Sequence, residues 1–164
     1  MTLRLILMRH AKSSWDHPGL SDHDRPLNGR GKRAARAIGD WLRKCDYIPD
    51  QTLSSTAQRT RETNALLGFD TAAQFTPRLY HAEPQTMLDV LKGAAGQSVL
   101  MIGHNPGIAW LAEGLVSSPP AHPRFHDYPT GATLVAEFSG DTWNAISPGT
   151  ATVLDFITPR ELTG

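Results

Sequence analysis

The chain has 164 residues, of which 40% are hydrophobic and 20% charged, a composition that excludes a disordered or collagen-like polypeptide. Sixteen basic residues balance 16 acidic ones, so no overall field steers the protein to nucleic acid or to an anionic membrane. The single Cys45 excludes an intrachain disulfide and a multi-cysteine zinc site, and no apolar stretch approaches the roughly 20 residues of a spanning helix. We therefore expect one globular domain over residues 1–164, in a cytoplasmic protein that binds neither nucleic acid nor membrane.

Predicted strands and helices alternate along the chain. A compact apolar run at 3–8 predicts a buried first strand, and the polar segment 11–27, with two prolines and a glycine, predicts a loop. Apolar residues at helical spacing, with helix stop signals, predict helices at 32–44, 58–67, 84–92 and 108–115. Further strands are predicted around 52–54 and at 72–75, 98–102, 132–138 and 152–157. This alternation predicts the α/β class: a three-layer α/β/α sandwich with a mostly parallel central sheet.

Unusual residues follow three of the predicted strands, at the end where open parallel sheets bind their ligands. Arg9 and His10 follow the first strand, Ser55 and Arg59 follow the second, and His104 follows the fourth. Arginines bind the nonbridging oxygens of a phosphoryl group, and a neutral histidine can attack phosphorus. The helix that begins after His104 adds backbone donors for an anion. These residues together predict a phosphoryl-transfer site at one edge of the sheet.

The same segments resemble the motifs of the histidine phosphatase superfamily. Residues 7–15 resemble its Arg-His-Gly signature, 55–63 its second arginine motif and 101–106 its second histidine motif. Residues 24–27 and 156–162 are also similar to family segments, so the resemblance covers essentially the whole chain. The compact length is similar to that of the SixA-like phosphohistidine phosphatase branch. The resemblance implies a phosphoglycerate mutase-like fold.

The resemblance also implies roles for four residues. His10 is expected to be the nucleophile of a metal-independent phosphatase and to be phosphorylated transiently. Arg9, Arg59 and His104 are expected to hold the phosphoryl oxygens and the charge that develops in the transition state. Position 11 is alanine where the signature has glycine, which is a mild departure.

The general-acid glutamate of the phosphoglycerate mutase branch has no clear counterpart in this chain. The corresponding region, residues 78–83, reads Arg-Leu-Tyr-His-Ala-Glu, so Glu83 or His81 could serve as the acid. Asp16 and Asp24 are further candidates. We include Glu83 among the expected catalytic residues.

Three further residues are expected to bind substrate: Ser13, Asp16 and Asn105. Asn105 is expected first to cap the helix that follows it and then to lie beside the phosphate. His122 and His126 are four residues apart, as helical metal ligands are, but the prolines around them argue against a helix. No metal and no cofactor is expected.

The lengths of the loops indicate the class of substrate. Only the loops at 11–27 and 117–130 are long, and a site with so little cover suits phosphohistidine on a protein. The alternatives are a low-specificity phosphomonoesterase acting on small phosphate esters and a non-catalytic module that binds phosphorylated ligands. His10 argues against the last, since a binding module needs no nucleophile. Trp15 could stack on a substrate, although half-buried packing under the first loop is the favoured interpretation.

Overall fold

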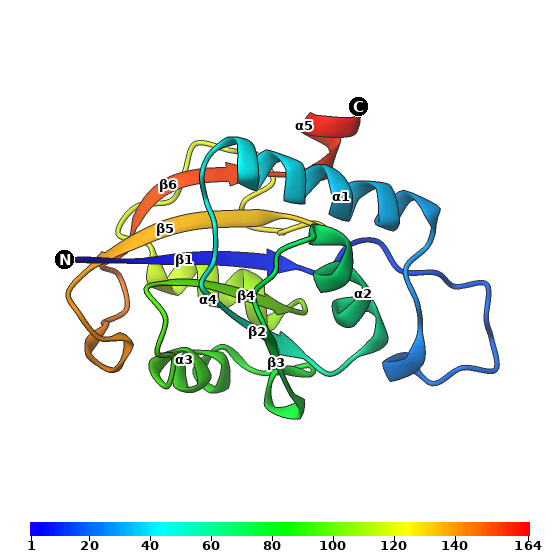
Figure 1. The fold of residues 1–164 in the computed structure, drawn as a ribbon, viewed down its shortest axis with the longest axis horizontal. Helices are drawn as coiled ribbons and strands as arrows, with labels where there is room; N and C mark the ends of the chain where they lie inside the picture. Colours follow the sequence, from blue (N-terminus) through cyan, green and yellow to red (C-terminus); the bar gives the residue numbers. More distant parts are fainter.

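The computed structural model describes residues 1–164 and contains one six-stranded sheet between two layers of helices (Figure 1). The strands are β1 (Thr2–Arg9), β2 (Gln51–Ser55), β3 (Ala73–Thr76), β4 (Ser98–Gly103), β5 (Thr133–Ser139) and β6 (Thr152–Ile157). The helices are α1 (Gly29–Lys44), α2 (Gln58–Leu67), α3 (Pro84–Lys92), α4 (Gly107–Leu115) and α5 (Pro159–Thr163). None of them combines the length and apolar character needed to cross a membrane.

The sheet is mostly parallel, as predicted. Its strand order is β3-β2-β4-β1-β5-β6, and the pairs β3–β2, β2–β4 and β4–β1 are parallel. Strand β5 runs antiparallel to both β1 and β6, so it is the one strand whose direction is reversed. Helical crossovers join the parallel strands, whereas β5 is joined to β6 by residues 140–151, which contain one short helical turn and no crossover helix. The predicted three-layer α/β/α class is therefore confirmed.

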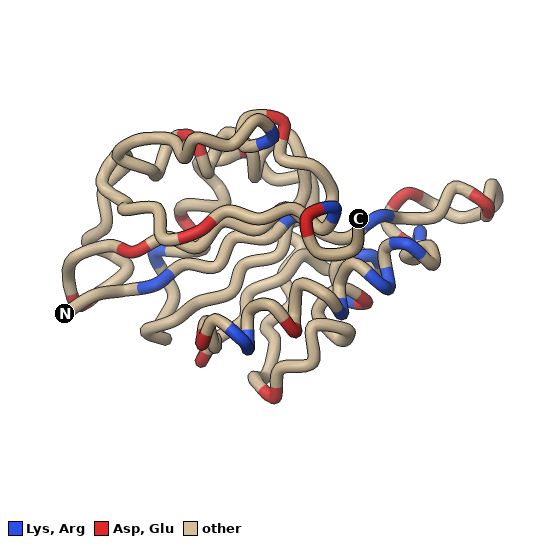
Figure 2. Tube along the Cα trace, turned by 90° about the horizontal axis from the view of Figure 1, so that it is seen from above, with Lys and Arg blue, Asp and Glu red and all other residues tan.

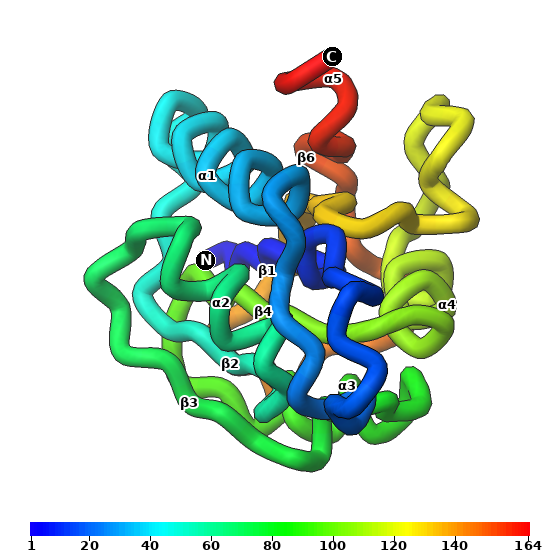
Figure 3. The backbone as a smooth tube through the Cα atoms, turned by 90° about the vertical axis from the view of Figure 1, so that its right-hand side faces the viewer, coloured from blue at the N-terminus to red at the C-terminus, as the bar shows by residue number.

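Alternating side chains of β1 contribute to the two larger hydrophobic cores, one on each face of the sheet. Leu5 and Leu7 point to one face of the sheet and pack with residues of α3 and α4. Ile6 and Met8 point to the other face and pack with residues of α1 and α2. Figure 3 shows these two helix pairs on opposite sides of the strands. Because each of these side chains is completely buried, each contributes about 1.5–3 kcal/mol to folding, and the strand that carries Arg9 is held rigidly.

Helix α1 begins at Gly29, three residues before the predicted start. The side chain of Asn28 caps it by accepting a hydrogen bond from the Gly31 amide at 2.8 Å. Gly31 allows a close approach, because a Cβ atom there would lie 2.0 Å from the carbonyl oxygen of Lys12. The first loop is thereby packed against the first turn of α1.

Candidate active site

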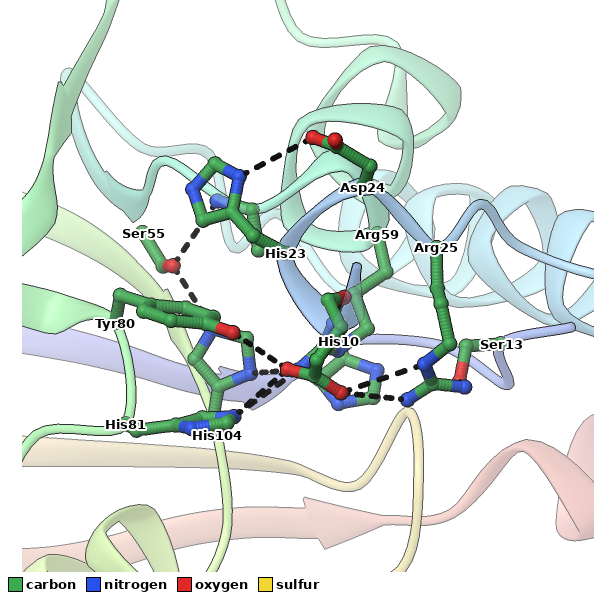
Figure 4. Close-up of polar contacts among 12 residues, drawn as sticks. His10, Ser13, His23, Asp24, Arg25, Ser55, Arg59, Tyr80, His81 and His104 are labelled. Carbon is green, nitrogen blue, oxygen red and sulfur yellow. Dashed lines mark hydrogen bonds and ion pairs between the residues drawn. The ribbon is translucent and has the colours of Figure 1, made fainter. Parts of the chain in front are cut away.

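A pocket of about 340 Å³ lies at the carboxyl ends of β1, β2 and β4. The strand register sets Arg9 opposite Gly103 and Ser54 opposite Ile102, so the residues that follow emerge at the same edge. The lining is almost entirely polar: Arg9, His10, Lys12, Ser13, Trp15, Asp22, Arg25, Arg59, His81, His104, Asn105 and Thr130. The structure thus brings together the four residues expected to act on phosphate, Arg9, His10, Arg59 and His104. Figure 4 shows three of them, His10, Arg59 and His104, side by side.

His10 is a buried imidazole with one nitrogen already committed. Its Nδ1 lies 2.7 Å from the carbonyl oxygen of Ala11, so Nδ1 carries the proton and Nε2 keeps a free lone pair. Burial lowers the pKa of His10 to about 3, against the opposing effect of the Ala11 carbonyl, and the charges of Arg9 and Arg59 lower it further. At neutral pH this imidazole is therefore uncharged.

His104 lies next to His10, with the two ring centroids 5.2 Å apart. Its Nε2 lies 2.8 Å from the hydroxyl of Ser55, and its Nδ1 lies 3.3 Å from Nη2 of Arg59. Burial, together with the neighbouring His10 and Arg59, holds the pKa of His104 well below its ordinary value. Both imidazoles of the site are thus neutral at pH 7.

The two arginines concentrate positive charge at the pocket. Arg59 is 2% exposed, which excludes a solvated position on the outside of α2. The guanidinium of Arg9 donates to the Tyr128 carbonyl at 3.2 Å, and burial and the charge of Arg59 lower its pKa. Two guanidinium groups that line one pocket favour an anion between or beside them.

A carboxylate that the sequence analysis missed lies in the pocket. Asp22 accepts hydrogen bonds from Nη2 of Arg59 at 3.0 Å and from the Tyr80 hydroxyl at 2.5 Å. Its Oδ1 lies 3.3 Å from Nη2 of Arg25, and its Oδ2 lies 3.3 Å from Nε2 of His81. Burial alone raises the pKa of Asp22, but the hydrogen bonds from Tyr80 and Arg59 outweigh it and lower the pKa far below the usual range. Asp22 is therefore ionised and forms ion pairs with Arg25 and Arg59 in the pocket.

The other expected residues divide into two groups. Ser13 lines the pocket, where its hydroxyl accepts a hydrogen bond from Arg25 at 2.9 Å. Asp16 and Glu83 are not among the lining residues, and Glu83 instead precedes α3 at its N-cap position. Of the residues considered for the general acid, His81 alone reaches the pocket.

Asn105 lies at the pocket, but it is not the predicted helix cap. Its amide donates to the carbonyl oxygens of Asp127 and Tyr128, at 2.9 and 3.1 Å, and Pro106 is the residue at the N-cap position of α4. The side chain is turned toward the loop at 117–130, because carbonyl groups of this loop lie outside the sheet and accept from side chains; the Tyr128 carbonyl also accepts from Arg9. Asn105 therefore ties this loop to the rim of the pocket.

Trp15 is more exposed than predicted. Its side chain is not packed under the first loop: the residue is 78% exposed, and the guanidinium of Arg25 lies over its ring at 3.6 Å from the centroid. Arg25 itself is buried and anchored by Ser13. The indole is thus held at the pocket rim with much of its surface free.

No group of three or more His, Cys, Asp or Glu side chains is arranged to hold a metal ion. His122 and His126, whose spacing resembles that of helical metal ligands, each pair with a different carboxylate. His122 lies 3.0 Å from Glu161, and His126 lies 2.8 Å from Glu113.

Comparisons with known proteins agree with this geometry. Residues 5–83 match the model of the histidine phosphatase superfamily (branch 1). The uncharacterized protein Rv1276c of Mycobacterium tuberculosis is 38% identical over 160 residues, which cover 93% of this chain and 100% of that protein. Two solved structures whose descriptions name them as SixA phosphohistidine phosphatases share the fold over at least 97% of their own length.

The SixA structure from Nakamurella multipartitia is 29% identical, with a TM-score of 0.86, and the alignment covers 97% of each chain. The SixA structure from Agrobacterium tumefaciens is 30% identical, with a TM-score of 0.77, and the alignment covers 96% of this chain and 98% of that one. The similarity therefore extends over all elements that build the pocket.

Proposed function

Because this chain belongs to the histidine phosphatase superfamily, we propose that it hydrolyses phosphohistidine carried by a protein, through a covalent intermediate on His10. The state of His10 carries the proposal. Its Nδ1 proton is held by the Ala11 carbonyl, so the lone pair of Nε2 is available. A pKa of about 3 keeps this imidazole neutral, and therefore nucleophilic, throughout the physiological range.

The reaction proceeds in two displacements. In the first, Nε2 of His10 attacks phosphorus, the Nε2–P bond forms and the P–N bond to the substrate imidazole breaks. In the second, water attacks phosphorus, the Nε2–P bond breaks and inorganic phosphate leaves with His10 restored. Arg9, Arg59 and His104 hold the nonbridging oxygens in both steps, and removing one such donor typically costs about 10²–10³-fold in rate.

The incoming phosphoryl group displaces Asp22. The carboxylate of Asp22 is the anion that now accepts from Arg59, and a phosphoryl group offers the same arginine a second set of acceptor oxygens. Asp22 belongs to the first loop, whose short helical turn spans Asp22–Asp24, and this loop moves as a unit more easily than the sheet beneath it.

His81 is placed to move the proton. Its Nε2 lies 3.2 Å from Nη2 of Arg59 and 3.3 Å from the Asp22 carboxylate, and its side chain is 51% exposed at the mouth of the pocket. In the first step the protonated imidazole donates to the leaving group, and in the second the neutral imidazole accepts a proton from water.

The lining of the pocket supports a protein substrate. Pockets that recognise small organic molecules are mostly apolar and run from about 300 to 1,000 Å³. This pocket is at the lower end of that range, and Trp15 is the only large apolar side chain in its lining. It therefore recognises the phosphoryl group and leaves the rest of the substrate outside, as a phosphorylated protein requires. The same property also suits a low-specificity phosphomonoesterase, which is the second candidate.

Two matched peptides separate these functions. They share one sequence and carry either phosphohistidine or phosphoserine, and aryl phosphate serves as a third substrate. We expect kcat/KM for phosphohistidine to exceed that for phosphoserine by about 10²-fold, because an alkoxide needs a general acid far more than an imidazole does. His10→Asn is expected to abolish turnover and keep phosphate binding, and wild-type protein to yield an acid-labile, base-stable phosphoenzyme.

Equal rates for the two peptides would move the assignment to the phosphomonoesterase. Phosphate binding without turnover of any of the three substrates would make the protein a binding module.

A further inference from the structure

A second cavity, of about 600 Å³, lies beside the pocket of the candidate active site and shares Lys12 and Thr130 with it. Its walls come from the first turns of α1, from the loop at 117–130 and from the carboxyl-terminal segment that forms α5. The lining residues are Lys12, Arg30, Arg33, Ala34, Arg124, Pro129, Thr130, Thr158, Pro159, Arg160, Thr163 and Gly164. We refer to this cavity as the cationic groove.

Most of the positive charge of the groove is unpaired, and the only negative group in its lining is the terminal carboxylate of Gly164. Five of its lining residues are Lys or Arg and none is Asp or Glu. Arg124 pairs with Asp127 at 2.9 Å, whereas Lys12, Arg30, Arg33 and Arg160 have no carboxylate oxygen within 4.0 Å. Because the chain as a whole has no net charge, this concentration is local. It favours binding of an acidic partner at this face.

The fold holds these cations on one side of the pocket. Arg30 and Arg33 lie three residues apart in α1 and so share a face of the helix. The close approach of Gly31 to Lys12 joins this face to the pocket. Figure 2 shows the Lys and Arg positions of α1 lying beside the carboxyl terminus, where α5 carries Arg160.

We propose that the cationic groove binds acidic side chains that flank the phosphohistidine on the substrate protein. This inference rests on the proposed function and adds the chemistry of the surface that presents the phosphate. A small anion would need fixed polar partners, but the cations here are exposed and all but Arg124 have no acidic partner to fix them. The one buried polar side chain, Thr158, already shares its hydroxyl with Glu161. An extended acidic surface needs only a broad positive field of this kind.

Peptide substrates test the groove directly. Three phosphohistidine peptides differ only in the residues flanking the phosphohistidine on both sides, which are Glu and Asp, Gln and Asn, or Lys. At low ionic strength we expect kcat/KM for the acidic peptide to exceed that for the neutral one by about tenfold, with the basic peptide slowest. At about 0.5 M salt the three values converge, because exposed charges are then screened within a few ångströms.

Two triple variants locate the effect. Arg30→Glu, Arg33→Glu and Arg160→Glu together are expected to remove the preference for the acidic peptide while turnover of aryl phosphate stays unchanged. The matched control, Lys32→Glu, Arg36→Glu and Lys44→Glu, alters the net charge equally with exposed residues that line neither cavity, and should keep the preference. Equal kcat/KM values for the acidic and neutral peptides would show that the cationic groove does not bind acidic side chains, and would leave the proposed function in place. No turnover of any phosphohistidine peptide, with aryl phosphate still hydrolysed, overturns both.

Discussion

The hydroxyl of Ser55 lies 2.8 Å from Nε2 of His104 and fixes which nitrogen of that imidazole faces the active-site pocket. Ser55 ends β2, is completely buried and also accepts a hydrogen bond from the Ala57 amide at 3.2 Å. Nη2 of Arg59, which can only donate, lies 3.3 Å from Nδ1, so Nε2 of His104 carries the proton and donates to the Ser55 hydroxyl. When a phosphoryl group takes the Arg59 donor instead, the Ser55 hydroxyl can turn and donate to Nε2, and Nδ1 then carries the proton that it donates to a phosphoryl oxygen. We therefore predict that Ser55 is a positioning residue for His104.

Replacing Ser55 by Ala should lower kcat. Losing one buried hydrogen bond costs about 1–2 kcal/mol, which corresponds to a rate loss of roughly tenfold. We expect KM for aryl phosphate to stay within about twofold, because Arg9 and Arg59 still bind the ground state. Ser54→Ala is the matched control, since Ser54 is equally buried and donates only to the Ser55 carbonyl. A change in KM with kcat intact would contradict the positioning role.

The leaving-group dependence tests His81 as the acid. His81→Gln is expected to lower kcat/KM for a phosphoserine peptide by about 10²-fold, and that for phosphohistidine and aryl phosphate by less than about threefold. Glu83→Gln serves as the comparison, because Glu83 does not line the pocket and its variant should match wild type on all three substrates. If instead Glu83→Gln selectively slows phosphoserine hydrolysis, Glu83 is the acid.

Much of the site could be predicted from the sequence, because parallel strands deliver their following residues to a common edge. Arg9, His10, Arg59 and His104 follow or lie next to strands whose apolar character is clear, and the structure brings them together in one pocket. The helix Gln58–Leu67 was predicted to the residue, since Gly68 stops it in the left-handed conformation.

The parts that could not be predicted depend on tertiary contacts of the loops. Asp22 reaches the pocket only because the first loop folds back over Arg59, and no local pattern distinguishes it from Asp16 or Asp24. Asn105 has the residue type and position of a helix cap, yet carbonyl groups of a loop more than 20 residues away take its amide instead. Long-range partners of this kind override local propensity.

The depressed pKa values of the two histidines predict how stability depends on pH. Below pH about 6.5 an unfolded chain protonates both imidazoles, whereas the folded chain leaves His10 neutral down to about pH 3 and His104 neutral as well. The stabilisation is therefore complete above pH 6.5 and is lost as the pH falls toward 3. Between pH 6.5 and 5, His10 alone accounts for a loss on the order of 2 kcal/mol.

Denaturant unfolding at pH 7.5 and pH 5 measures this loss. His10→Asn should reduce the difference between the two pH values, while the exposed control His17→Asn should retain it. An identical pH dependence in His10→Asn and wild type would mean that His10 is protonated in the folded protein.

Activity should not depend on a divalent metal. The arginines of the pocket supply the positive charge that metal ions supply in other phosphatases, and the one carboxylate of the pocket, Asp22, is paired with Arg59 and Tyr80. We expect turnover of aryl phosphate to survive exhaustive dialysis against a chelator, and vanadate and inorganic phosphate to inhibit competitively. Loss of activity that added Mg²⁺ or Zn²⁺ restores would show a metal requirement.

The exposed indole of Trp15 provides the last test, because its position links the first loop to the substrate. The ring lies at the pocket rim, one face covered by the guanidinium of Arg25 and 78% of the residue exposed, a free area that an imidazole of the substrate can cover. We expect Trp15→Ala to raise KM for a phosphohistidine peptide by about fivefold to tenfold, in line with roughly 1 kcal/mol for an aromatic contact, and to change kcat for aryl phosphate little. Trp110→Ala, on the outside of α4 and 56% exposed, is the matched control and should leave both constants unchanged. If both variants behave like wild type on the peptide, the Trp15 ring does not contact the substrate. A fall in kcat on aryl phosphate in Trp15→Ala alone would instead assign the indole to holding Arg25 in place.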